Sequence, residues 1–154
     1  MHGLWMKYRR PATEIALLAV LGAFSAAACG TGAAEMSTPS LNFDGAAAQT
    51  VASSSGQLMI AIRWSPDVPL RGSDAAQLTF LDAAGNPVDG LDLAIVPWMP
   101  AHGHGTAVQP VIMTTAPGVQ VATPLYLFMS GEWQLRMTIT GAMNDSAIAT
   151  VEIP

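Results

Sequence analysis

The stretch Trp133-Gln134-Leu135-Arg136-Met137-Thr138-Ile139 decides the fold class. Its large apolar residues occupy every second position and polar residues occupy the positions between them, which is the period of a strand with one buried face. A tight turn at Ser130-Gly131 precedes the stretch, and residues 141–145 form another turn after it. The segment therefore predicts a β-strand that covers a hydrophobic core.

The same period of two recurs along the chain, between breaks rich in Gly, Pro, Asn and Asp. The further strands are expected at residues 57–64, 77–81, 91–97, 110–114, 119–129 and 147–152. A break is expected at Pro124, because proline cannot donate to a central ladder, and residues 69–74 are expected to form a loop. About seven short strands without a helical period predict an all-β fold, an antiparallel immunoglobulin-like β-sandwich.

Residues 1–28 have the composition of an export signal. A basic segment ending at Arg10 precedes an apolar run at 15–24, which is shorter than the roughly 20 residues that span a bilayer as a helix. Ala26-Ala27-Ala28 then supply the small residues that signal peptidases require. We expect this segment to be cleaved from an exported protein.

Cys29 is the only cysteine of the chain and directly follows the three alanines. It resembles the acylated cysteine of a bacterial lipoprotein, although Ala26 replaces the usual leucine of that motif; the alternative is an unpaired thiol left by ordinary cleavage. Small and polar residues dominate 29–56, which predicts a lipidated flexible tether, with residues 41–43 and 50–51 as candidates for a short edge strand. Residues 57–154 are expected to form one β-sandwich domain.

The charge of the chain after residue 28 excludes several classes of partner. Three arginines stand against ten acidic residues, a formal net charge of −7. Nucleic-acid binding is not expected, because neutralisation of phosphates by cationic side chains dominates that affinity. Charge also gives no attraction to anionic lipid, so membrane attachment is expected through the acyl chain alone.

No arrangement in the sequence indicates an enzyme. A nucleophilic Gly-x-Ser-x-Gly elbow is absent, and no glycine-rich phosphate loop opens a helix. Asp82, Asp89 and Asp92 stand in or beside turns, where carboxylates are solvated rather than paired for acid–base work. Catalysis is therefore not expected.

The loop Trp98-Met99-Pro100-Ala101-His102-Gly103-His104-Gly105 carries every histidine except His2. His102 and His104 are close enough to chelate one ion, and the glycines after them can take positive φ, which lets both rings turn inward. Thioether sulfur from Met99, and next from Met129 on a neighbouring segment, would favour copper, since Met prefers Cu(I) and His accepts both oxidation states. The alternative is that the histidines are exposed turn residues and the methionines fill the core.

Two segments also carry a family resemblance. Met99-Pro100-Ala101-His102-Gly103-His104-Gly105 and Phe128-Met129-Ser130-Gly131-Glu132-Trp133 resemble, in order and spacing, the paired motifs of the YtkA-like/FixH-like family of small exported domains. The resemblance implies an immunoglobulin-like fold and a link to extracytoplasmic copper handling or respiratory oxidase assembly. FixH proteins proper carry a membrane helix before this domain, whereas a cleavable signal and a tether are expected in this chain.

Together these observations predict a periplasm-facing or outer-surface lipoprotein of a bacterial envelope whose sandwich domain binds copper at the His-Gly-His loop, as a chaperone or sensor module. The alternative function is a metal-free interaction or structural domain that contacts another envelope protein.

Overall fold

The computed structural model describes residues 40–154, so the expected signal peptide and Cys29 lie outside the described residues. Nine strands form the described part: β1 (Gln49–Ala52), β2 (Met59–Ser65), β3 (Gly72–Leu81), β4 (Leu91–Met99), β5 (His104–Gly105), β6 (Val111–Ala116), β7 (Val119–Leu127), β8 (Gly131–Gly141) and β9 (Asp145–Ile153). Within this range, no helix combines the length and the apolar character needed to cross a membrane.

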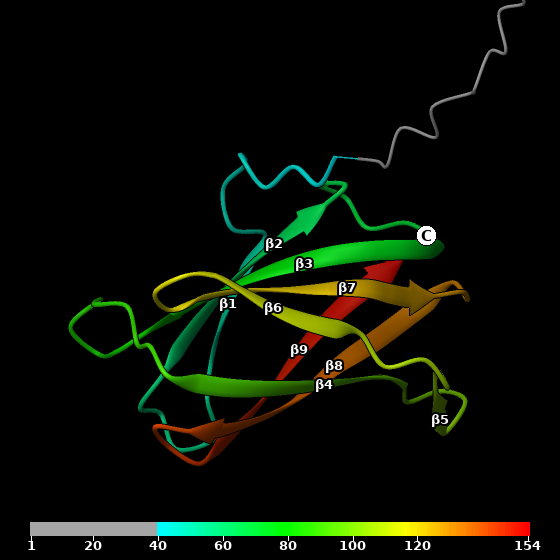
Figure 1. The fold of residues 1–154 in the computed structure, drawn as a ribbon. Helices are drawn as coiled ribbons and strands as arrows, with labels where there is room; N and C mark the ends of the chain where they lie inside the picture. The colour runs from blue at the N-terminus through cyan, green and yellow to red at the C-terminus, as the bar shows by residue number, and fades with distance from the viewer. Residues whose placement is uncertain (1–39) are drawn as a thin grey trace, which may run out of the picture. The chain divides into compact units, whose positions relative to one another are not determined.

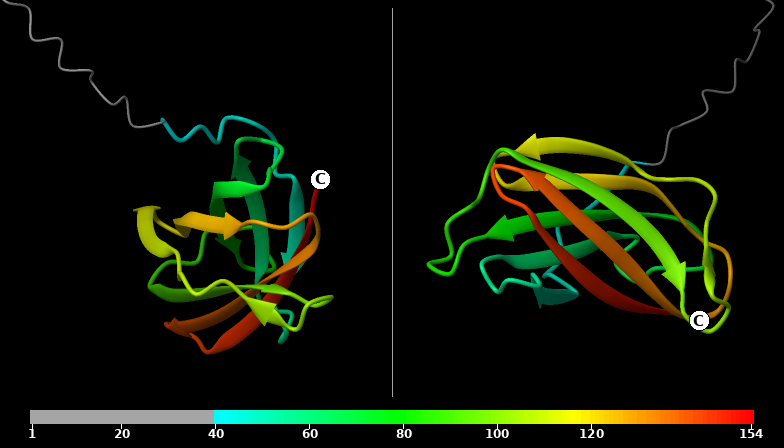
Figure 2. Two further views of the ribbon diagram at one scale, coloured as in Figure 1. Left: turned by 90° about the vertical axis from the view of Figure 1, so that its right-hand side faces the viewer. Right: turned by 90° about the horizontal axis from the view of Figure 1, so that it is seen from below.

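The strands form two antiparallel sheets that pack face to face (Figure 1). Sheet A has the order β1-β2-β3-β7-β6, and sheet B has the order β5-β4-β8-β9. Without β1 and β5, these orders are the four-plus-three arrangement of an immunoglobulin-type sandwich. The two layers are seen from an end and from below in Figure 2. The predicted all-β sandwich is confirmed.

The alternation that predicted the strands also identifies the core. On β8 the side chains of Trp133, Leu135, Met137 and Ile139 are at most 2% exposed, and they face the apolar side chains of sheet A. The indole of Trp133 donates a hydrogen bond from Nε1 to the Met129 carbonyl at 2.9 Å, which satisfies its one polar group in the core. The remaining core side chains come from the other strands, as in Leu58, Ile60, Ile62, Trp64, Leu78, Phe80, Ile95, Leu125, Leu127 and Ile153.

Two prolines lie inside strands: Pro124, where a break was expected, and Pro97, where the strand was expected to end. Pro97 pairs with Leu135 in β8, but β5 covers β4 only from Trp98 onward, so Pro97 faces an open edge that needs no donor. Pro124 has no partner in either ladder, because the β3–β7 register shifts there and β6 pairs no further than Thr123. The predicted break at Pro124 is therefore wrong: β7 continues through an irregularity in its ladder.

The strand count exceeds the expected seven through two short edge strands. β1 pairs with β2 at residues 49–52, so the segment expected to be a tether includes the edge strand that its sequence allowed at 50–51. β5 has two residues, and no sequence period could reveal it. β3 starts at Gly72, inside the expected loop at 69–74.

Candidate metal site at the His-Gly-His loop

The two histidines lie in a tight hairpin at one end of sheet B. After β4 ends at Met99, the amides of His102 and Gly103 donate to the Met99 carbonyl at 3.2 and 3.0 Å. The chain then returns as β5, in which His104 pairs with Met99 and Gly105 pairs with Trp98. The backbone therefore fixes His104 beside Met99.

The two glycines of the loop have different physical roles. Gly103 has φ of +68°, the conformation that the sequence analysis expected both glycines of the loop to allow. Gly105 does not have positive φ, and here the prediction is wrong. A Cβ at Gly105 would instead overlap the carbonyl oxygen of Pro97, so its glycine is needed for the close approach of β5 to β4.

Both imidazoles are exposed and lie close to each other. Their ring centroids are 5.7 Å apart with an interplanar angle of 62°. A metal ion lies about 2.0–2.1 Å from a ligating imidazole nitrogen, so two rings on one ion have centroids roughly 5–6 Å apart. The His104 Nδ1 lies 3.2 Å from the Gly105 carbonyl; donation to that oxygen requires the Nδ1–H tautomer, which leaves Nε2 free to ligate. The separation of the two rings therefore falls within the range that joint coordination of one ion requires.

Met99 is the residue of this hairpin whose side chain is buried in the core. Its side chain is 2% exposed, and its Cε lies 3.1 Å from the position that a Cβ on Gly131 would take. Cross-strand neighbours share one face of a sheet, with Cβ atoms about 4.5–5.5 Å apart, so the Met99 and His104 side chains start from adjacent points. This pairing therefore sets a buried methionine and an exposed histidine at adjacent positions of the hairpin.

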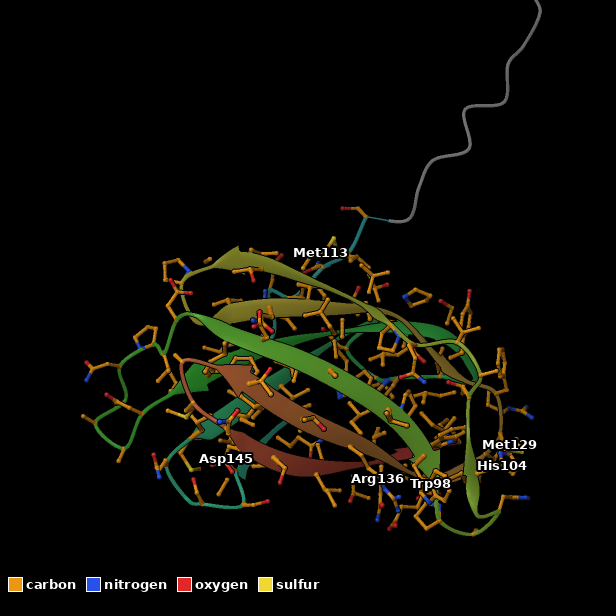
Figure 3. All side chains as sticks on the ribbon, turned by 60° about the horizontal axis from the view of Figure 1, so that its bottom comes forward. Trp98, His104, Met113, Met129, Arg136 and Asp145 are labelled. Carbon is orange, nitrogen blue, oxygen red and sulfur yellow. The ribbon has the colours of Figure 1, made fainter. Side chains whose placement is uncertain are left out.

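Met129 lies at the same end of the sandwich as His104 (Figure 3). It is half-buried against the core, two residues before the Gly131 that contacts Met99. Met113 lies apart from both in the same view, on the exposed edge strand β6. Met99 and Met129 therefore lie at the end of the sandwich that carries the histidines, whereas Met113 does not.

The candidate metal ligands at this loop are the two histidines and the two methionines Met99 and Met129. Residues 40–154 contain no cluster of three or more His, Cys, Asp or Glu side chains that could hold an ion. Two imidazoles supplemented by thioether sulfur suit copper better than zinc or calcium, which need more nitrogen, thiolate or oxygen ligands. These donor types are the ones that copper prefers, and Met99 is the methionine that the strand pairing sets next to His104.

The sequence analysis missed a second feature beside this loop. The guanidinium carbon of Arg136 lies 4.4 Å from the ring centroid of Trp98, a cation–π contact between β8 and β4. The alternation of β8 put Arg136 on the outer face, but only the β4–β8 register brings it next to Trp98.

The chain was compared with known families, curated proteins and solved structures. The family model described as YtkA-like matches residues 54–138, which include β2 to β7, the His-Gly-His loop and most of β8. No curated protein and no solved structure gives a significant match. Because the family match covers more than half of the chain, this protein belongs to the YtkA-like family.

Proposed function

We propose that this domain binds one copper ion at the His-Gly-His loop, with His102 and His104 as the main ligands. The observation that carries the proposal is the β4–β5 pairing of His104 with Met99, which joins an exposed imidazole to a buried thioether. Met99 is the preferred sulfur ligand of the proposal, and Met129 is the next candidate for that one position.

The two kinds of ligand prefer different oxidation states of copper. Imidazole accepts Cu(II) and Cu(I), whereas thioether favours Cu(I). The exposed histidines would therefore capture copper from solution, and Met99 would strengthen the reduced state after a small movement of the hairpin. A site with exposed ligands and a weak third donor suits transfer or sensing of copper better than permanent storage.

The proposed setting is the bacterial envelope, and membership of the YtkA-like family supports an envelope-associated domain of this size. We propose that the exported chain is anchored through an acylated Cys29 and that the domain acts as a non-catalytic copper chaperone or sensor. A metal-free domain that contacts another envelope protein is the alternative, and the test below separates the two.

Titration with Cu(II), and with Cu(I) under reducing conditions, tests the proposal through tryptophan fluorescence. Trp64 and Trp133 are 2% and 1% exposed, whereas Trp98 is half-buried next to the loop. Bound copper should quench Trp98 at a ratio of one ion per protein. His102→Ala/His104→Ala should lose Cu(II) binding and retain the fold, because both side chains lie outside the core.

Met113→Ala is the matched control, because Met113 is an exposed methionine on β6 away from the loop. It should bind copper as the parent does, whereas Met99→Ala should weaken Cu(I) more than Cu(II). If the double histidine variant binds copper as tightly as the parent, or if stoichiometric copper causes no quenching and is not retained, the interaction alternative replaces the copper proposal.

A further inference from the structure

The outer face of sheet B carries a row of three side chains that the strand registers align. Val96 on β4 pairs with Arg136 on β8, and Arg136 pairs with Ile148 on β9. Val96 and Ile148 are 40% and 54% exposed, so an arginine stands between two large aliphatic side chains on a solvent-facing surface. Paired residues on adjacent strands are neighbours on one face, so the three side chains form one continuous patch.

Arg136 is held in place within this patch. Its guanidinium lies over the Trp98 ring, and Nε and Nη2 both donate to Oε1 of Gln134 at 3.1 Å. These contacts fix the plane of the guanidinium and use one edge of its fork. One N–H on Nη2 and both on Nη1 are left to face a ligand, which is the geometry that receives a carboxylate in a bidentate pair.

Arg136 is an isolated positive charge within sheet B. Among the four strands of sheet B it is the only arginine or lysine. Residues 40–154 contain three arginines and nine acidic residues, so a cation held in this way lies on a domain that is otherwise acidic. Arginine and tryptophan, which are in contact here, are also among the residues that contribute most to binding energy in protein interfaces.

We propose that the surface formed by Val96, Trp98, Arg136 and Ile148 binds a segment of a partner protein that presents a carboxylate next to aliphatic side chains. The carboxylate pairs with the free edge of the Arg136 guanidinium, and the aliphatic side chains cover Val96 and Ile148. The stacking on Trp98 lowers the cost of binding, because the arginine is already ordered. This surface lies on the outer face of sheet B, whereas Met99 points into the core, so the proposal does not depend on copper.

A library of random displayed peptides tests the chemistry without prior choice of a partner. Peptides are selected on the metal-free protein and counter-selected on Arg136→Gln. The enriched peptides should contain Asp or Glu beside Val, Leu or Ile. A synthetic peptide from this pool should shift the backbone amide resonances of Val96, Trp98, Arg136 and Ile148, and its Glu-to-Gln counterpart should bind at least about tenfold more weakly.

Two further variants of the protein complete the test. Arg71→Gln removes one positive charge, as Arg136→Gln does, but from an exposed arginine outside sheet B. It should therefore leave peptide binding unchanged. Arg136→Lys keeps the charge but loses the fork and the stacking, and should bind more weakly than the parent. Enrichment without acidic residues, equal binding to Arg136→Gln, or resonance shifts that map to residues 100–104 instead of the proposed surface would each overturn the proposal.

Discussion

Gly105→Ala tests whether the β4–β5 hairpin organises the copper ligands. The added Cβ would overlap the Pro97 carbonyl oxygen and would lie 3.3 Å from the Pro97 carbonyl carbon and 3.7 Å from the Trp98 Cα. These are backbone atoms of β4, which cannot rotate away as a flexible side chain would. The hairpin must therefore open, and His104 must separate from Met99.

The expected loss of copper affinity in Gly105→Ala follows from two free-energy costs. Overpacking typically costs about 1–3 kcal/mol, and each backbone hydrogen bond lost from β5 adds about 1 kcal/mol. A cost of about 2 kcal/mol in the arrangement that binds copper lowers the apparent affinity roughly 30-fold, because affinity scales with the population of the competent state. The melting temperature should change little, since neither residue of β5 belongs to the core.

Gly103→Ala is the matched comparison. A Cβ there meets nothing within 4 Å, so the cost arises only from φ of +68°. That cost is about 1 kcal/mol, equivalent to roughly a fivefold loss of copper affinity. For both variants, titration measures the copper affinity, and hydrogen exchange measures the protection of the backbone amides at positions 98 and 105. If Gly105→Ala keeps slow exchange and an affinity within about twofold of the parent, the hairpin does not organise the site.

Three further predictions concern the fold and the anchor. The hydroxyls of Ser53 and Ser55 lower the pKa of Asp145 to about 2. The stability that this carboxylate contributes is therefore present above its unfolded pKa of about 3.9 and is lost as the pH falls toward 2. Asp145→Asn should lower the melting temperature at pH 7, and its difference from the parent should vanish near pH 2. Leu135→Ala truncates a side chain with no exposed surface and should cost about 2–5 kcal/mol in denaturant unfolding; a cost below about 1 kcal/mol would contradict the assigned core. Cys29→Ser should release the protein from membranes or block its maturation, as fractionation would show, whereas a parent protein that is fully soluble after export would refute the lipid anchor.

The sequence predicted the elements whose evidence is local. Trp133, Leu135, Met137 and Ile139 alternate with polar residues, and all four are buried. A period of two is enough to assign a strand and its buried face, because side chains alternate across a sheet wherever the strand lies.

Features that depend on neighbouring strands could not be predicted. The effect of Pro97 depends on whether β4 has a partner on both sides, and only the two-residue length of β5 shows that it does not. The contact of Arg136 with Trp98 likewise requires the β4–β8 register. In the candidate metal site, the spacing of His102 and His104 predicted their proximity, but not that β5 pairs His104 with a buried Met99.

The central claim is that copper binds to imidazole and thioether together at this loop. X-ray absorption spectroscopy of the protein loaded with one equivalent of Cu(I) tests it most directly. The account predicts scattering from the rings of two histidines and from one sulfur, with the sulfur lost in Met99→Ala and both imidazoles lost in His102→Ala/His104→Ala. A copper environment without imidazole scattering, or one that both variants leave unchanged, would contradict it.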